Sequence, residues 1–306
     1  MISGREGGKK FTRALSAEAL MGLHRLLPLK YKFRPETLVL TEGNEILGLI
    51  TVQTTPGNPY KINITRLLFK QNHNDAGKQL VEYVIAKYGA KGAMSFSVAV
   101  DEAHGELMDL FISGCGFRQC SCEELWKAEN FNSAESCINF RPALNSDAQT
   151  MCDLYNNELI GIYHPSLERK KEEYREPLFA GLRNNYKIRY VLEQENQLLA
   201  YLSITVSDNL NLVTIDISKT DMVSYNEMLN FAINEISKRK SGYQILAKLR
   251  KYVQGAEEFE NCLQTNGFAR VNTQFILVKD FYTPIKEQTL NPLQVFLFGE
   301  RQVLSS

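Results

Sequence analysis

An internal repeat constrains the fold of this 306-residue chain more than any other feature of its sequence. LVLTEGNEILGLITV at residues 38–52 and YVLEQENQLLAYLSITV at residues 190–206 both alternate apolar and polar residues on either side of a polar turn. This pattern predicts a β-hairpin. The hairpins are offset by 152 residues, and the Gly-Phe pairs at 116–117 and 267–268 are offset by 151. Self-similarity at a fixed period predicts two copies of one structural unit.

Between hairpin and Gly-Phe pair, each half has the pattern strand, helix, strand, helix. We expect these elements at residues 61–69, 76–89, 93–100 and 104–114 of the first half, and at 211–218, 224–240, 243–250 and 256–266 of the second. The second half also has a charged segment, residues 164–185, which we expect to form an extra helix.

The repeat predicts two α+β domains, residues 1–130 and 138–306. The segment between them, residues 129–139, is polar and unpatterned, as a linker should be. The tail, residues 284–306, alternates polar and apolar residues, and we expect it to pack on the second domain.

The charge balance argues against a general nucleic-acid binder. Lys and Arg total 35, and Asp and Glu also total 35, so the formal net charge is zero. No apolar run approaches the length of a membrane-spanning helix, and the first residues, MISGREGGKKF, do not resemble a signal peptide. We therefore expect a cytoplasmic protein with neither a nucleic-acid nor a membrane partner.

Six cysteines fit reduced thiols in that compartment. Cys120 and Cys122 are two residues apart on an expected strand and could share a face, which raises the alternative of a zinc site. No CxxC partner pair and no nearby His pair completes a four-ligand set. We therefore expect no metal.

The order of elements resembles the GCN5-related N-acetyltransferase (GNAT) superfamily, twice over. The clearest marks are FRPALNSDAQTMCDLYNN at residues 140–157, which is similar to the opening strand and helix of that family, and the two Gly-Phe turns. The resemblance implies an α+β (α/β) fold of two tandem domains, each a mixed, mostly antiparallel central sheet flanked by helices. It also implies acetyl transfer from acetyl-CoA, as co-substrate, to a small-molecule or peptide amine, and it allows a homodimer.

In that family acetyl-CoA lies between two splayed parallel strands, and its pyrophosphate lies on a loop of the form (Arg/Gln)-x-x-Gly-x-(Gly/Ala). Carried over to this chain, the resemblance implies a cofactor site at the strand end and the following loop: Leu67, Phe69, Asn72, Asp75, Ala76, Gly77 and Lys78. The free amides at a helix start would meet the anion there.

This loop departs from the family pattern at two positions. Asn72 stands at the Arg/Gln position, and Asp75 stands at the first glycine. A carboxylate at Asp75 would repel a pyrophosphate unless it pointed away, and an Asp before a helix can instead be its N-cap. The second half, DISKTDMVSYNEML at residues 216–229, has no glycine. We therefore expect CoA binding in the first domain if in either.

The family often uses a Tyr four residues before the Gly of the Gly-Phe turn to protonate the departing thiolate. This chain has Ile112 and Leu263 there. The candidates for a catalytic role are His73, Asp101 and Glu102, with turn and helix-start roles as the structural alternatives.

Three interpretations remain open. The first is an acyl-CoA-dependent N-acyltransferase, and the second is a non-catalytic tandem GNAT-fold protein for ligand sensing or protein contacts. The third is an aminoacyl transfer protein resembling the tandem-GNAT peptidoglycan-bridge enzymes, which would need a basic groove for tRNA and is disfavoured by the zero net charge.

Overall fold

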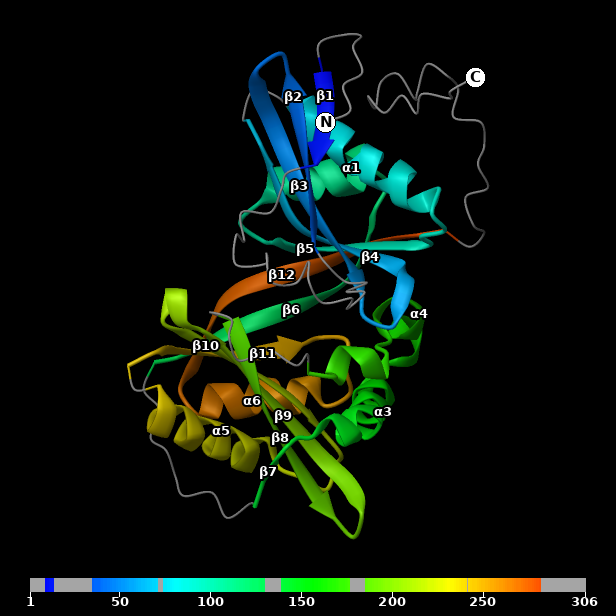
Figure 1. Cartoon of the computed structure of the whole chain (residues 1–306). Coiled ribbons are helices and arrows are strands. Elements are labelled where there is room, and N and C mark those ends of the chain that lie inside the picture. The colour runs from blue at the N-terminus through cyan, green and yellow to red at the C-terminus, as the bar shows by residue number, and fades with distance from the viewer. Residues whose placement is uncertain are drawn as a thin grey trace, which may run out of the picture. The chain divides into compact units, whose positions relative to one another are not determined.

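The computed structural model describes residues 9–13, 35–70, 74–129, 139–176, 185–240 and 242–281. Contacts divide the chain into two compact units (Figure 1). The first contains the described residues up to Gln119 and from Ile276 onward, and the second contains Cys120–Phe275. No helix in these ranges is long and apolar enough to cross a membrane.

The first unit is a mixed sheet with a long helix on one face. Its strands are β1 (Lys9–Arg13), β2 (Glu36–Glu42), β3 (Glu45–Thr55), β4 (Asn58–Phe69) and β5 (Ser95–Asp101). The first four pair antiparallel in chain order, and β5 pairs parallel to β4. Helix α1 (Asn74–Gly89) connects β4 to β5 and packs on β2, β3 and β4. A short helix α2 (Gly105–Asp109) follows β5 and continues into a π-helical turn, Leu110–Gly114.

The second unit repeats this plan with more helices. Its elements are β6 (Arg118–Ala128), β7 (Arg141–Pro142), α3 (Ala148–Glu158), α4 (His164–Leu167), β8 (Asn185–Gln194), β9 (Gln197–Ser207), β10 (Leu212–Lys219), α5 (Tyr225–Arg239), β11 (Gln244–Arg250), α6 (Ala256–Thr265) and β12 (Phe268–Asp280). Short 3-10 turns lie, within the described residues, at Asn145–Asp147, Gly161–Tyr163, Lys171–Tyr174 and Asp208–Leu210. Strands β7 to β10 pair antiparallel in chain order, and β11 pairs parallel to β10.

The predicted repeat is confirmed in the order and direction of the strands. Both hairpins form, with Gly43 at φ +59 in the first turn and Asn196 at φ +62 in the second. Both Gly-Phe turns have a glycine in the left-handed region, Gly116 at +69 and Gly267 at +73. Only glycine adopts this backbone readily, which explains why the same residue type recurs at the two positions. The predicted α+β class of two GNAT-like halves is therefore correct.

The last strand of each half belongs partly to the other unit. Strand β6 follows the first Gly-Phe turn, yet it pairs antiparallel with β11, from Glu123 opposite Arg250 to Lys127 opposite Leu246. Strand β12 begins in the second unit and ends in the first, where Ser95 Oγ donates a hydrogen bond to Asp280 over 2.7 Å. The predicted boundaries, 1–130 and 138–306, correspond to the two copies of the repeat. The compact units differ from them because most of β6 belongs to the second unit and the end of β12 belongs to the first.

The extra helix predicted over residues 164–185 is interrupted within its described part. Helix α4 ends at Leu167, and the backbone is extended at Glu168 (ψ 136) and Lys170 (ψ 152). Arg169 lies between these two residues, and its guanidinium carbon is 4.0 Å from the centre of the Tyr155 ring. This cation–π contact accompanies the break in the helix. Residues 130–138 of the predicted linker, residues 177–184 and the tail 284–306 lie outside the described residues.

The sheet of the second unit has one apolar and one polar face. The apolar face packs on α5 and α6 through a buried cluster that includes Ile204, Val213, Ile215, Met228, Leu229, Ala247, Leu249, Phe259 and Leu263. Alternate residues of a strand point to opposite faces, so Asp216, Lys248 and Arg250 point the other way. Helix α3 contacts β9 and β10 on that side.

Candidate functional site

Each unit contains a parallel strand pair that comes apart part-way along. In the first unit β4 and β5 pair from Lys61 opposite Ser95 to Ile64 opposite Val98, and beyond these residues they no longer pair with each other, although β4 stays paired with β3 as far as Phe69. In the second unit β10 and β11 pair only as far as Ile215 opposite Ala247. A strand edge without a partner leaves N–H and C=O groups that an extended, amide-containing ligand can pair.

The edge in the first unit is formed by Leu67 and Phe69. The Lys70 amide donates to the Leu47 carbonyl over 3.0 Å, so Lys70 and Leu68 direct their backbone groups toward β3. Because these directions alternate along a strand, the backbone groups of Leu67 and Phe69 point toward the β5 side. Among the described residues no side chain bonds to them. This edge is open.

The corresponding edge in the second unit is closed by two side chains. The Gln244 amide donates to the Asn211 carbonyl, so the alternate residues Ile217 and Lys219 face the β11 side. The Arg250 guanidinium donates to the Ile217 carbonyl, and the Glu158 carboxylate accepts the Lys219 amide over 2.5 Å. Arg250 also donates to Ser218 Oγ at 3.0 Å and lies 3.3 Å from Glu158.

This ion pair is buried, with 3% of the Arg250 side chain and 7% of the Glu158 side chain exposed. Burial raises the pKa of the Glu158 carboxyl, although the Arg250 charge and the Lys219 amide act against the shift. The pKa of Asp216 is lowered: burial alone would raise it, but the Arg250 and Lys248 charges outweigh that. Arg250 and Glu158 therefore supply hydrogen-bond partners to the backbone of β10, and their opposite charges offset each other.

This chain is similar to known proteins in its structure and not detectably in its sequence. No family model matches the sequence, and no curated protein matches it. Among solved structures, a tandem GNAT protein from the clavulanic acid biosynthesis pathway superposes with a TM-score of 0.59 at 10% identity, over 89% of this chain and 98% of the other. The chain has the tandem GNAT fold.

Two further structures agree with this fold. A GCN5-related N-acetyltransferase from Sphaerobacter thermophilus superposes with a TM-score of 0.55 at 8% identity, covering 82% of each chain. A putative acetyltransferase from Pyrococcus horikoshii gives 0.53 at 9% identity, over 82% of this chain and 75% of the other. At such identities the likeness establishes the GNAT fold and leaves the chemistry to the site residues.

The loop after β4 is described from Asn74 onward, so the predicted positions Asn72 and His73 lie outside the described residues. Helix α1 begins at Asn74, which places Asp75 and Ala76 in its first turn. The alternative prediction of Asp75 as N-cap is therefore wrong by position, because the cap precedes the first helical residue. Asp75 and Lys78 are exposed, and Lys78 Nζ lies 3.8 Å from Glu82 one turn along.

Gly77 is explained by a contact within the first unit. A Cβ added there would lie 2.7 Å from Cε1 of Phe69, closer than real Cβ contacts come. The Phe69 ring thus lies against the backbone at Gly77, while the Phe69 backbone forms part of the open edge. A glycine at this GNAT loop position has a packing reason whether or not a phosphate binds.

The catalytic candidates Asp101 and Glu102 lie at the carboxyl end of β5. Asp101 accepts the Ala103 amide at 2.9 Å through its side chain and the His104 amide at 2.9 Å through its carbonyl, which closes a turn before α2. Glu102 and His104 are exposed. Ile112, at the family's Tyr position, is 37% exposed.

A metal site and a surface depression were also considered as places for a ligand. Within the described ranges, no three His, Cys, Asp or Glu side chains are grouped so as to hold a metal ion. A shallow depression at the start of α5 is lined by Ser224, Tyr225, Asn226, Glu258, Asn261, Cys262, Thr265 and Asn266. Ser224 Oγ accepts the Asn226 amide there, and Glu258 adds a negative charge, so the depression is poorly suited to a pyrophosphate.

The sequence did not predict the contact between Arg250 and Glu158. They are 92 residues apart and lie on different elements. The only signal was a charged residue ending each of two apolar patterns, in a helix and in a strand. Such a signal is common at the surface.

Proposed function

We propose that this chain is an acyl-CoA-dependent N-acyltransferase whose working site lies in the first unit. The carrying observation is the difference between two equivalent strand edges. The backbone groups of Leu67 and Phe69 have no partner on the β5 side among the described residues, whereas those of Ile217 and Lys219 are bonded to Arg250 and Glu158. A cytoplasmic location and a small-molecule or peptide amine as acceptor are part of the proposal.

The residues of the first unit fit an acyl-CoA in three respects. The edge at Leu67 and Phe69 offers backbone donors and acceptors to the amides of an extended pantetheine arm. The first amides of α1 lack partners within the helix and favour an anion, and Lys78, the fifth residue of the helix, adds a cation just after that turn. Bound acetyl-CoA would supply the activated thioester.

Proton transfer falls to polar groups near the end of β5. An amine must lose a proton to attack a thioester, and a positioned carboxylate assists such transfers by about 10²–10⁴-fold. Asp101 and Glu102 lie at the carboxyl end of β5, the strand that separates from β4, and ligands collect at the carboxyl ends of parallel strands in open sheets. With Ile112 at the family's Tyr position, the thiolate leaves without that general acid.

The second candidate function is a non-catalytic scaffold that binds a ligand or a protein. Two observations favour it. Asp75 places a carboxylate in the first turn of α1, where it competes with a bound anion, and the Phe69 ring already occupies the space beside Gly77.

Calorimetric titration with acetyl-CoA separates the two. The test variant is Lys78→Glu, with Lys91→Glu as the matched control, because both lysines are exposed and Lys91 lies beyond the other end of α1. We expect one binding site, weakened about tenfold in Lys78→Glu and unchanged in Lys91→Glu, since an ionic contact contributes roughly 1.5 kcal/mol. Asp75→Asn should tighten binding.

Turnover is then measured as release of the CoA thiol with a panel of primary amines and peptides. Release that depends on an amine supports the acyltransferase. Absence of acetyl-CoA binding would favour the scaffold. Gly77→Val is unsuitable as a probe, because it would also displace Phe69.

A further inference from the structure

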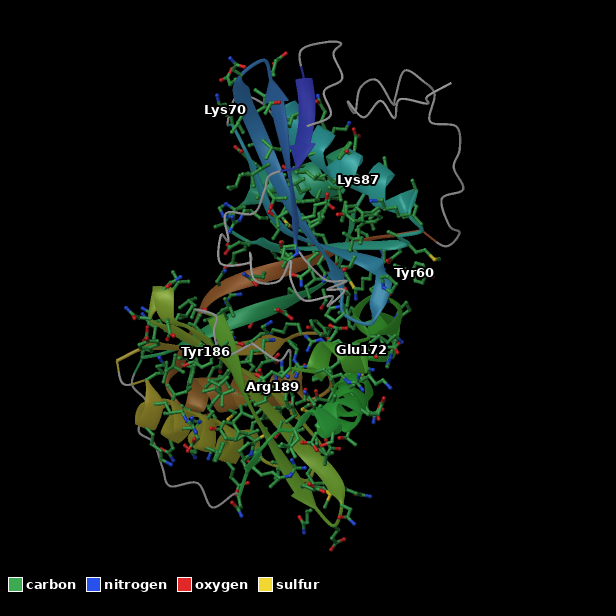
Figure 2. All side chains as sticks on the ribbon, viewed as in Figure 1. Tyr60, Lys70, Lys87, Glu172, Tyr186 and Arg189 are labelled. Carbon is green, nitrogen blue, oxygen red and sulfur yellow. The ribbon has the colours of Figure 1, made fainter. Side chains whose placement is uncertain are left out.

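The polar face of the second unit's sheet gathers an excess of positive charge. Lys187 and Arg189 are two residues apart on β8, and Lys248 and Arg250 are two residues apart on β11, so each pair points to the same side of its strand. That side is opposite the apolar cluster, since Tyr190 of β8 and Leu249 of β11 belong to the cluster. Figure 2 labels Arg189. We call this side of the sheet the cationic face.

The cationic face is connected by short contacts to the segment after α3. Arg189 Nη1 donates to the Tyr174 carbonyl at 2.8 Å, and Arg169 lies 3.4 Å from the Tyr174 hydroxyl. Tyr174 in turn packs edge-on against Tyr201 of β9, with ring centres 5.6 Å apart. A fifth cation, Arg169, is thereby held over the same face.

Carboxylates do not balance these cations. Lys248 pairs with Glu123 at 2.9 Å, and Arg250 pairs with Glu158 and with Asp216, each at 3.3 Å. Five cations (Arg169, Lys187, Arg189, Lys248 and Arg250) thus face three carboxylates (Glu123, Glu158 and Asp216). The excess amounts to two positive charges.

Two of the cations have buried donors without a partner among the described residues. These are Arg250 Nη1, on a side chain that is 3% exposed, and Arg189 Nε. A buried charged donor without a hydrogen-bond partner costs free energy. In folded proteins nearly all such donors are therefore bonded to protein, water or a ligand. Arginine donors and an excess of positive charge suit carboxylate or phosphate oxygens.

We propose that the cationic face of the second unit binds a small dianion through carboxylate or phosphate oxygens, with Arg189, Arg250 and Lys187 as its main cationic contacts. This site is separate from the open strand edge of the first unit and does not depend on acyl transfer. The second unit, whose strand edge is closed by Arg250 and Glu158, would then bind a ligand different from that of the first unit.

Lys187 makes the proposal testable. The pKa of Lys187 is lowered to about 8, chiefly by loss of surrounding water and in addition by the charges of Arg169, Arg189 and Lys248, while Asp216 acts against the shift. A bound anion favours the protonated ammonium. Affinity should therefore fall as the pH rises through about 8.

The probes are inorganic phosphate and succinate, titrated calorimetrically into the full chain at constant ionic strength, with acetate as the singly charged control. Lys187→Gln removes one contact cation. Lys238→Gln is the matched control, because Lys238 is 70% exposed and contacts only Glu235 among the described residues. Thermal unfolding checks that both variants are folded.

We expect one of the two dianions to bind with at least about tenfold preference over acetate, and Lys187→Gln to weaken it about tenfold while Lys238→Gln changes it less than twofold. Which dianion binds distinguishes a carboxylate from a phosphate ligand. The decline in affinity between about pH 7 and pH 9 should vanish in Lys187→Gln. Absence of binding by both dianions at millimolar concentration, or equal losses in the two variants, would overturn the proposal.

Discussion

Replacing Arg250 by Met tests the closed strand edge of the second unit through its energetics. Met keeps most of the side-chain length but removes the hydrogen bonds to the Ile217 carbonyl and Ser218 and leaves Glu158, 7% exposed, without its cation. Breaking a buried ion pair by removing one partner costs about 3–5 kcal/mol. We expect Arg250→Met to lose that much free energy of unfolding near neutral pH.

The double variant Arg250→Met, Glu158→Gln isolates the unpaired charge. Gln retains an oxygen for the Lys219 amide and removes the negative charge, so the double variant should be more stable than Arg250→Met alone by at least about 1 kcal/mol. Burial raises the folded-state pKa of Glu158, and loss of Arg250 raises it further. A raised carboxyl pKa gives stability that is present below the unfolded pKa and is lost as the pH rises through the folded pKa.

Urea unfolding at about pH 7.5 and about pH 5 measures both effects. The deficit of Arg250→Met should shrink at the lower pH, where Glu158 takes up a proton, and the deficit of the double variant should change less. A loss below about 1 kcal/mol in Arg250→Met, or a double variant no more stable than Arg250→Met, would refute the reasoning.

Three further predictions concern stability. Gly77→Ala should cost about 1–3 kcal/mol by overpacking against Phe69, and Phe69→Leu should relieve part of that loss in a combined variant, as thermal unfolding would show. Ser224→Ala should cost about 1 kcal/mol because Ser224 caps α5, whereas Ser224→Asp should retain most of the stability in urea unfolding. Hydrogen bonds from Arg141, at 2.8 and 3.1 Å, lower the pKa of Asp147 below its usual range, so its stabilisation is present above the unfolded pKa and is lost as the pH falls through the folded pKa. Asp147→Asn should therefore be less stable than wild type by up to about 1 kcal/mol at neutral pH. A stability difference between the two proteins that is the same at pH 7 and at pH 3 would contradict this.

Much of the fold follows from local patterns. Alternation over residues 38–52 and 190–206 gives the two hairpins, and the helical period after each splayed strand gives α1 and α5. The two Gly-Phe pairs were readable because a left-handed backbone at Gly116 and Gly267 demands one residue type.

The sequence did not predict that β6 pairs with β11 or that β12 ends in the first unit. The alternating pattern after each Gly-Phe turn predicts a strand but does not identify the strand with which it pairs. The break after α4 was missed because Arg169 leaves the helical path for a tertiary contact with Tyr155. The ion pair of Arg250 with Glu158 depends on two elements meeting in space, and neither residue's sequence neighbours signal it. The predicted loop residues of the first unit remain a prediction, with Asn72 and His73 outside the described residues.

The most direct test of the central claim is hydrogen–deuterium exchange with and without acetyl-CoA, followed by mass spectrometry of peptides from both units. The account predicts slower exchange in peptides that contain Leu67, Phe69 and the first turn of α1, because a bound ligand would occupy that strand edge and helix end. Peptides that contain Ile217 and Lys219 should be unaffected, because Arg250 and Glu158 already hold their backbone groups. Protection confined to residues 212–224, or no protection in either unit, would contradict it.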